Sequence, residues 1–385
     1  MDSFFQTYFT DLVPFSFLLK TDDEVKKIGK EEPKFTIMMH KMPGKKELLT
    51  STSLALGEAY MRGDIDIDRD LYEGLDLFLA QMANFHRDKR ALRHLLYTSL
   101  SKKNQEKEVT SHYDIGNDFY KLWLDDTMSY SCAYFKKESD DLNQAQLNKV
   151  DHILEKLQLK KGMTLLDIGC GWGFLLKRAV EKYGVRGVGI TLSEEQYKSF
   201  QEEIVANQME EQLFVKRMDY RELEKSGMKF DRVVSVGMLE HVGRDNYDLF
   251  FQNVNAVLKE RGVFLLHFIS AKKEHDGDAW IKKYIFPGGV VPSLREIMNL
   301  MPEYNFYTLD IESLRRHYTK TLLCWRENFL AHREEIVAMQ DETFARMWEL
   351  YLASCAATFH NGIIDLHQIV MSKGVNNELA MTRKV

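Results

Sequence analysis

Short apolar runs alternate with stretches of helical spacing between residues 164 and 268. Three stretches repeat apolar residues three and four positions apart and predict helices, the second with Ser193 as its N-cap: 174–183, 193–208 and 247–258. The apolar runs around them have the length of buried strands: 164–167, 186–190, 213–217, 230–236 and 263–268. A run such as 263–268 is also compatible with a buried helix, but the flanking glycine favours a strand. The alternation predicts a doubly wound, mostly parallel α/β sheet.

The chain before residue 100 has a mixed pattern that predicts a small α+β domain. Phe35–Met39 predicts a short strand, and Leu56–Met61 and Gly74–Phe85 have helical spacing. Residues 101–108 read SKKNQEKE, and a wholly polar stretch of this kind is typical of a solvated linker. We therefore expect an N-terminal accessory domain over 1–100, a linker over 101–110 and a larger domain over 111–385.

The composition is that of a globular protein of about two to three domains, since a domain has roughly 150 residues. Of 385 residues, 44% are hydrophobic and 29% are charged, which excludes a disordered chain. No apolar run approaches the ~18 residues of a spanning helix. The apolar N-terminus carries Asp2 and Asp11 where a signal peptide needs positive charge, so it is interpreted as ordinary structure.

The four cysteines and the net charge narrow the function classes further. The cysteines form no CxxC pair and no His/Cys cluster with zinc spacing, so no metal site is predicted. Without an export signal, reduced thiols in the cytoplasm are expected. A net charge of -6 argues against a dedicated nucleic-acid binder, and no nucleic-acid partner is expected.

The strongest local motif is LLDIGCGWG at 165–173, where a strand ends near Asp167 and Gly169, Gly171 and Gly173 turn the chain into a helix. Glycine is required where the backbone adopts positive φ or a ligand approaches closely, and the helix N-terminus favours a polar or anionic ligand. The spacing GxGxG differs from the dinucleotide fingerprint GxGxxG. It resembles the first motif of class I S-adenosylmethionine (SAM) methyltransferases, although a nicotinamide or flavin site or a ligand-free turn remains open.

The second strand lacks the acid that many nucleotide-binding enzymes place at its end to hold ribose hydroxyls. It runs instead into Ile190, Thr191, Leu192 and Ser193, with Gln196 one turn later. This departure from the general methyltransferase pattern fits one particular family.

The stretch GITLSEEQ at 189–196 resembles the cyclopropane-fatty-acyl-phospholipid synthases and the related mycolic acid cyclopropane synthases. Other stretches resemble the same family, in order along the chain: HYDIGNDFYKLWLD at 112–125, YSCAYF at 130–135, LLDIGCGWG at 165–173, MLEHVG at 238–243, LLHFI at 265–269 and KYIFPGG at 283–289. LALGEAYMRGDIDI at 54–67 resembles the accessory domain of the phospholipid enzymes, which the mycolate enzymes lack. The resemblance covers almost the whole chain.

The resemblance implies a class I SAM-methyltransferase fold and methyl transfer from SAM to the cis double bond of an unsaturated phospholipid chain. A base then removes a methyl proton and a cyclopropane ring closes. The resemblance gives that role to a bound bicarbonate, held by Cys132, Glu240, His267, the backbone of Ile269 and Tyr318. The chemistry requires a dry apolar slot, because water would quench the developing cation.

Positions that match the family's SAM site are spread over four segments. They are Tyr130, Ser131, Asp167, Gly169, Gly171, Gly173, Thr191, Leu192, Gln196, Asp219 and Tyr220. Asp219 and Tyr220 are assigned to the adenine, where related enzymes often carry Trp-Glu and this chain departs with Tyr220-Arg221.

Plainer interpretations exist for several of these residues. A cysteine among aromatics, such as Cys132, is most often a small buried hydrophobe. From the residues alone, His241 competes equally with His267, and only the resemblance selects His267. Cys355 also matches the family, but its helical spacing among apolar residues indicates core, and methyl transfer to an alkene needs no covalent intermediate.

The implied substrate lies in a bilayer, so transient contact with the inner face of the cytoplasmic membrane is expected. Residues 82–100 carry four basic side chains among apolar ones, and Lys102, Lys103 and Lys107 follow; a solvated helix face is the equally weighted alternative. The phospholipid enzymes also suggest a homodimer. Two rivals remain: a SAM-dependent fatty-acyl methyltransferase that makes a methyl-branched chain, and a non-catalytic lipid-binding protein on the same scaffold.

Overall fold

The computed structural model describes residues 3–12, 15–81 and 116–381. They form two compact units, of which the first combines described residues of Met1–Tyr97 with Asp278–Ile285 and Leu322–Ile363. The second unit holds the remaining described residues, and the division falls within helix α14 (Arg315–Ala331). The expected linker over 101–110 lies outside the described residues, so that domain boundary stays a prediction.

The first unit contains a four-stranded sheet in the order β2-β1-β3-β4. Strand β1 is antiparallel to β2 and parallel to β3, which is antiparallel to β4. The strands are β1 (Phe17–Lys20), β2 (Val25–Ile28), β3 (Thr36–Met39) and β4 (Ile65–Ile67). Its core is rich in phenylalanine, and Phe17 stacks on Phe35 with the ring centroids 5.9 Å apart. The strand predicted over Phe35–Met39 is therefore confirmed as β3.

The described part of the first unit also contains the α14 residues from Leu322 onward and seven further helices: α1 (Ser3–Leu12), α2 (Lys45–Thr50), α3 (Thr52–Met61), α4 (Leu71–Leu79), α12 (Ala279–Tyr284), α15 (Arg333–Met339) and α16 (Glu342–His360). Helix α3 starts before the predicted range because Ser51 caps it, accepting a bond from the Leu54 N–H. The helix predicted over Gly74–Phe85 ends earlier than expected, because α4 stops at Leu79 and residues 80–81 form a turn. The last four residues of the predicted range lie outside the described residues. Among the described residues, no helix has the length and apolar content to cross a bilayer.

The second unit is built on a seven-stranded sheet in the order β10-β11-β9-β8-β5-β6-β7. Strands β7, β6, β5, β8 and β9 run parallel, whereas β11 is antiparallel to both β9 and β10. The strands are β5 (Thr164–Ile168), β6 (Arg186–Thr191), β7 (Leu213–Arg217), β8 (Phe230–Val236), β9 (Leu258–Ala271), β10 (Phe306–Ser313) and β11 (Ile364–Lys373). All five predicted strands and the mostly parallel sheet are confirmed.

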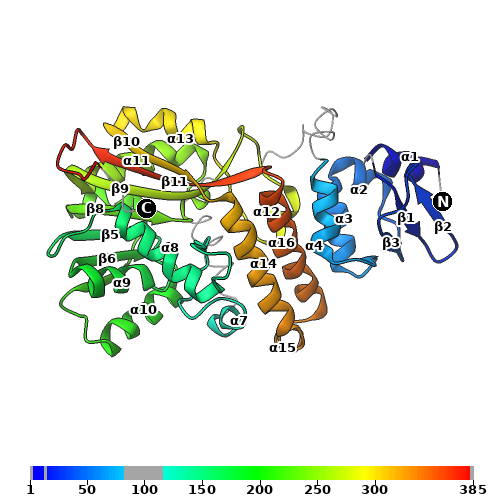
Figure 1. The fold of residues 1–385 in the computed structure, drawn as a ribbon, viewed down its shortest axis with the longest axis horizontal. Coiled ribbons are helices and arrows are strands. Elements are labelled where there is room, and N and C mark those ends of the chain that lie inside the picture. The colour runs from blue at the N-terminus through cyan, green and yellow to red at the C-terminus, as the bar shows by residue number, and fades with distance from the viewer. Residues whose placement is uncertain (1–2, 13–14, 82–115, 382–385) are drawn as a thin grey trace. The chain divides into compact units, whose positions relative to one another are not determined.

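Helices cover both faces of this sheet (Figure 1). Residues of α8 (Leu142–Lys156), α9 (Phe174–Tyr183) and α10 (Glu194–Ala206) join one apolar cluster. Residues of α11 (Tyr247–Val257) and α13 (Leu294–Leu300) join the cluster on the other face. The short helices are α7 (Asn117–Lys121) and the 3₁₀-helices η1 (Tyr220–Glu222), η2 (Glu224–Ser226), η3 (Leu239–His241), η4 (Arg244–Asn246) and η5 (Pro302–Tyr304).

The strand order reverses at β5, because β6 follows β5 on one side and β8 lies on its other side. Open α/β sheets bind ligands at such a switch point, in the crevice beyond the carboxyl ends of the strands. The predicted glycine motif directly follows β5. The topology therefore places the motif where a ligand is expected.

Candidate active site

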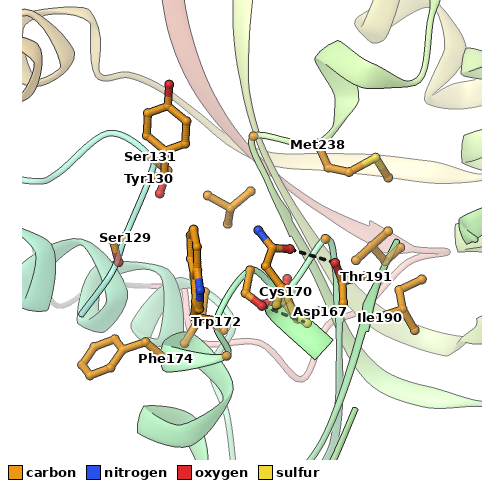
Figure 2. Close-up of a pocket in the computed structure, with 18 of the residues that line it drawn as sticks. Ser129, Tyr130, Ser131, Asp167, Cys170, Trp172, Phe174, Ile190, Thr191 and Met238 are labelled. Carbon is orange, nitrogen blue, oxygen red and sulfur yellow. Dashed lines mark hydrogen bonds between the residues drawn. The ribbon is translucent and has the colours of Figure 1, made fainter. Parts of the chain in front are cut away.

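A cavity opens at the carboxyl ends of β5, β6 and β8, and we refer to it as the glycine-loop pocket. Figure 2 shows Tyr130 and Ser131 on one side of it, Ile190 and Thr191 on the other, and Trp172 and Asp167 between them. Every residue predicted to bind SAM lines this pocket: Tyr130, Ser131, Asp167, Gly169, Gly171, Gly173, Thr191, Leu192, Gln196, Asp219 and Tyr220. Four distant segments of the sequence thus meet at one cavity.

The three glycines of the loop all have positive φ, at 82° for Gly169, 55° for Gly171 and 86° for Gly173. A Cβ at Gly173 would lie 2.2 Å from the Phe200 ring, so this glycine lets α9 pack closely against α10. A Cβ at Gly171 would meet nothing within 4 Å. Since Gly171 also lines the pocket, its open side is space that a ligand can use.

Two buried titratable residues, Asp167 and Lys149, line the glycine-loop pocket. Burial raises the pKa of Asp167 to about 7, although the Lys149 ammonium counteracts this, and Asp167 Oδ1 has no partner among the described atoms. Burial lowers the pKa of Lys149 to about 8, although Asp125, Cys132 and Asp167 nearby raise it. Lys149 Nζ donates to Ser131 Oγ at 3.0 Å. An orphaned carboxylate oxygen beside a glycine loop fits a ligand that carries a positive charge or hydrogen-bond donors.

Sequence reasoning missed Lys149, yet a signal was present. On α8 it is four residues after Ala145 and four before Ile153, both of which are buried. A lysine on the apolar stripe of a helix needs a buried partner, and such pairs gather at functional sites.

The segment that carries Tyr130 and Ser131 is held from two sides. Gln146 Nε2 donates to the carbonyls of Ser129 and Ser131, at 3.3 and 2.9 Å. The Tyr130 ring packs on Tyr120 and Trp123, with centroids 5.7 and 5.4 Å away. The latter two belong to the family-like stretch 112–125, of which residues 112–115 lie outside the described residues. This stretch also reaches the glycine loop itself, because Trp172 Nε1 donates to Asn117 Oδ1 at 3.0 Å.

The polar groups after β6 and β7 are largely satisfied by their own neighbours. Thr191 Oγ1 donates to Gln196 Oε1 at 2.8 Å, which fixes the pocket wall formed by GITLSEEQ. Arg221 binds Asp219 through Nε and Nη2, at 2.9 and 2.6 Å. Tyr220 is buried against Phe250, and its hydroxyl has no partner among the described atoms. The Tyr220-Arg221 departure from the family therefore gives Asp219 an internal ion pair.

A second set of polar groups lies next to the pocket, and we call Glu240, His267 and the Ile269 amide the acid–imidazole group. The Ile269 N–H donates to Glu240 Oε1 at 2.6 Å, so the predicted anion ligand Ile269 is engaged by the acid in this structure. His267 lies four residues before the end of β9, but it pairs with Val236, the last residue of β8. The His267 carbonyl accepts from the N–H of Gly237, which lines the pocket.

The acid–imidazole group contains two buried atoms with no hydrogen-bond partner among the described residues, Glu240 Oε2 and His267 Nε2. Burial raises the pKa of Glu240 to about 7, which the Ile269 N–H opposes. Burial lowers the pKa of His267 to about 3, and the positive charges of Lys149 and Lys156 lower it further. Leaving such atoms unpaired costs about 1–3 kcal/mol each, so they indicate a missing polar ligand.

The remaining predicted anion ligands, Cys132 and Tyr318, come from other elements. Cys132 directly follows Ser131 of the pocket wall, and its thiol donates to the Ala133 carbonyl at 3.2 Å. Burial raises the pKa of Cys132, and the Lys149 ammonium lowers it, so the thiol stays neutral. Tyr318 is buried on α14, where its N–H donates to the carbonyl of Leu314 at 3.0 Å; the Cys132 sulfur lies 3.9 Å from the same carbonyl.

Two other candidates from the sequence have different surroundings. His241 lines the glycine-loop pocket, its ring packs on Phe286, and burial lowers its pKa to about 4. Cys355 is half-buried on α16 of the first unit, and burial raises its pKa to about 12, which disfavours the thiolate that a nucleophile needs. A catalytic role for Cys355 stays a prediction.

Comparison with known proteins shows which family the chain resembles. A family model described as "Mycolic acid cyclopropane synthetase" matches residues 100–369, and a model for a domain of unknown function matches residues 1–90. The cyclopropane-fatty-acyl-phospholipid synthase of Escherichia coli (strain K12) is 42% identical over 349 residues, or 88% of each chain. A probable fatty acid methyltransferase of Pseudomonas putida is 38% identical over 351 residues, covering 89% of this chain and 88% of the relative.

Among solved structures, the mycolic acid cyclopropane synthase CmaA1, complexed with S-adenosylhomocysteine (SAH) and CTAB, is 36% identical to this chain. It matches with a TM-score of 0.65 and covers 70% of this chain and 98% of that chain. The similarity supports the class I SAM-methyltransferase fold that the sequence predicts.

Proposed function

The chain belongs to the mycolic acid cyclopropane synthetase family, and from this premise we propose that it converts the cis double bond of an unsaturated phospholipid acyl chain into a cyclopropane ring. The observation that carries the proposal is the pair of unpartnered buried atoms, Glu240 Oε2 and His267 Nε2, next to a glycine-loop pocket. When bound, SAM supplies an electrophilic methyl group and bicarbonate supplies a base for one proton of that methyl.

The glycine-loop pocket fits SAM on two structural grounds. The open side of Gly171 lets a ligand approach the backbone, and Asp167 Oδ1 is an acceptor without a partner among the described atoms. Thr191 lies on the wall opposite Tyr130 and Ser131 (Figure 2), and its hydroxyl donates to Gln196. These residues bind and orient the methyl donor in the proposed reaction.

The acid–imidazole group fits bicarbonate because the ion both accepts and donates hydrogen bonds. In the proposed site, Glu240 Oε2 is an acceptor for its hydrogen and His267 faces its oxygens. Cys132 and Tyr318 are proposed to complete the site. With a pKa of about 7, Glu240 can take or release a proton near neutral pH, as a general acid–base residue must.

The test is to incubate the protein with SAM and unsaturated phospholipid vesicles and to analyse the acyl chains by mass spectrometry. A cyclopropane chain is heavier than the starting alkene by one CH₂, and proton NMR of the ring methylene separates it from an isobaric methylene branch. Unchanged acyl chains, in a preparation that binds SAM by calorimetry, would indicate the non-catalytic lipid-binding alternative.

A second candidate function is methylation that ends in a methyl-branched chain, and the Pseudomonas putida relative favours it. That product is heavier than the alkene by CH₄ because the cation must also be reduced. A reductant is then required in the assay, whereas ring closure needs none. The redox requirement of the product therefore decides between the two functions.

We further propose that the protein contacts anionic membrane surface transiently and acts as a homodimer. The dimer rests on the resemblance to the phospholipid enzymes alone. For the membrane, Lys102, Lys103 and Lys107 are the sequence candidates, and they lie outside the described residues, as does the basic stretch 82–100.

Changing Lys102, Lys103 and Lys107 together to Glu should weaken binding to anionic vesicles about a hundredfold or more at low salt, since each basic residue contributes about 1 kcal/mol near such a surface. The effect should shrink in high salt because screening shortens electrostatic reach. Vesicle co-sedimentation measures both. A matched triple variant of the exposed Lys160, Lys161 and Lys225 controls for net charge, and equal binding by the two variants would remove the proposed contact.

A further inference from the structure

The His267 ring has one partner and one orphan nitrogen. On β11, Gln368 lies directly opposite His267 of β9 in the antiparallel register. Gln368 Nε2 lies 3.2 Å from His267 Nδ1, whereas His267 Nε2 has no partner among the described atoms. Because burial lowers the pKa of His267 to about 3, the ring is neutral and only one of its nitrogens carries hydrogen.

Which nitrogen carries the hydrogen follows from a third side chain, Lys156, which contacts Gln368. Its Nζ lies 2.9 Å from the Gln368 amide oxygen. An ammonium donates hydrogen bonds and accepts none, so the side of the amide that faces Lys156 must be the oxygen. The amide NH₂ then faces His267, and since it only donates, His267 Nδ1 must accept. The hydrogen of the neutral ring is therefore on Nε2.

Lys156 is itself fixed by acids from β10. Its Nζ donates to Glu312 Oε2 at 2.5 Å and lies 3.4 Å from Asp310 Oδ2. The lysine side chain is only 6% exposed, and Glu312 also binds His152, at 2.7 Å. A buried ammonium that donates to Glu312 and Gln368 and lies beside the Asp310 carboxylate is held by three polar groups, so it fixes the orientation of the Gln368 amide.

We propose that Lys156, acting through Gln368, holds His267 in the tautomer with hydrogen on Nε2, so that the ring presents an N–H donor to the anion of the active site. Both are positioning residues for the reaction proposed above, and the inference rests on that function only in naming bicarbonate as the anion. In the opposite tautomer, Nε2 would turn a lone pair toward the anion, and the hydrogen bond would become a repulsion.

The first test needs no turnover. Protein labelled with [¹⁵N]histidine is studied by NMR, with the His267 signals assigned by their loss in His267→Asn. The parent should show a pyrrole-like Nε2 and a pyridine-like Nδ1. In Gln368→Glu the side chain keeps its shape and still accepts from Lys156, but it has no hydrogen to donate. Its His267 should therefore place the hydrogen on Nδ1.

Two variants of Lys156 keep the proposal testable if the first substitution unfolds the chain. Lys156→Arg keeps a group that only donates, so the parent tautomer should remain. Lys156→Met removes the donor, frees the amide to flip, and should give a mixture of tautomers. Asn253→Asp, in a buried amide of α11 bonded to Leu249 and Glu224, is the matched control and should leave the His267 spectrum unchanged.

The second test links the tautomer to the anion. In carbonate-depleted buffer, Gln368→Glu should raise the bicarbonate concentration for half-maximal rate by about 10–100-fold, the worth of one hydrogen bond to a charged group. SAM affinity by calorimetry should stay within about twofold, because the network does not line the glycine-loop pocket. A parent with hydrogen on Nδ1, or a Gln368→Glu variant with hydrogen still on Nε2, overturns the proposal. A parent whose rate ignores bicarbonate overturns the base named under the proposed function, while the spectra still decide the tautomer.

Discussion

The glycine-loop pocket and the acid–imidazole group lie side by side in the second unit, but they are built in opposite ways. The pocket depends on backbone conformation: three glycines at positive φ, with Thr191 and Asp219 bonded to neighbours a few residues away. The acid–imidazole group depends on side chains from two separate elements, the 3₁₀-helix η3 and the strand β9, and two of its buried atoms lack partners among the described residues. Binding can be encoded in the backbone, whereas proton transfer needs side-chain atoms kept free for the substrate.

Glu240→Gln has the largest expected effect. If this variant remained active, the proton-transfer role of the acid–imidazole group would be wrong. The amide keeps an oxygen that accepts from the Ile269 N–H but replaces the acceptor Oε2 with an NH₂ donor and has no charge or basicity. Since Glu240 does not line the glycine-loop pocket, SAM affinity should be nearly unchanged. Turnover should fall by about 10²–10⁴-fold, the usual contribution of a positioned acid–base group. Single-turnover product formation and calorimetry with SAM measure the two effects separately.

The control for this variant is Glu303→Gln, at an exposed acid of η5. It should match the parent in turnover and SAM binding. Added bicarbonate should raise the parent's rate in carbonate-depleted buffer and help Glu240→Gln much less. Parent-like turnover of Glu240→Gln would mean that the proton leaves by another route.

The backbone side of the comparison is tested by Gly171→Val. A valine here faces both positive φ and a side chain that projects into the pocket, so SAM affinity should fall at least about tenfold. Gly227→Val is a close match, because Gly227 has a φ of 66° and its Cβ would also meet nothing within 4 Å.

Gly227 does not line the pocket, so Gly227→Val should share the backbone strain and keep SAM affinity. Calorimetry on both variants, with thermal unfolding as the measure of strain, separates binding from stability. Equal SAM affinity of the parent and Gly171→Val would remove the loop from the binding site.

The smallest expected effect is a gain in stability of Glu240→Gln. It would show that the ionised, buried Glu240 lowers the free energy of unfolding. The Glu240 pKa is raised from 4.5 to about 7, so the buried acid favours the folded state when protonated and disfavours it when ionised. The stability contribution is present below pH about 4.5 and is lost as pH rises through about 7.

Because Gln resembles the protonated acid, Glu240→Gln should unfold like the parent near pH 4.5 in carbonate-free buffer. Near pH 8 it should be more stable by about 1–3 kcal/mol. Thermal unfolding against pH measures this difference, and Glu303→Gln should show none. A constant difference between Glu240→Gln and the parent across this range would mean that the acid does not titrate near 7.

Much of the second unit could be predicted from the sequence because its signals are local. The apolar run before Asp167 and the spacing of Gly169, Gly171 and Gly173 predicted the turn after β5, and Ser193 predicted the start of α10. Each depends on residues within one or two turns of chain. The mixing of segments in the first unit was not predicted, because Asp278–Ile285 and Leu322–Ile363 carry no local sign of their packing partners.

The candidate site divides in the same way. Periodicity and spacing alone made His267 and His241 equal candidates for the functional histidine, and only the resemblance to the family favoured His267. In the structure, His241 lines the glycine-loop pocket, whereas His267 lies opposite Gln368 of β11, whose amide oxygen accepts from Lys156. Lys149 was overlooked because its burial depends on elements as far apart as Ser131 and Asp167.

The sequence by itself determined the strand-and-helix order, the conformation of the glycine loop and the family. Backbone conformation depends on each residue's own φ preferences and on its near neighbours in the chain, so a short stretch of sequence is enough to predict it. Only the tertiary structure decided which polar atoms are buried, what pKa values Glu240 and His267 have, and which His267 nitrogen holds the hydrogen. Desolvation and hydrogen bonding across β9, β11 and α8 set those properties, and both arise only when segments more than 100 residues apart are packed together.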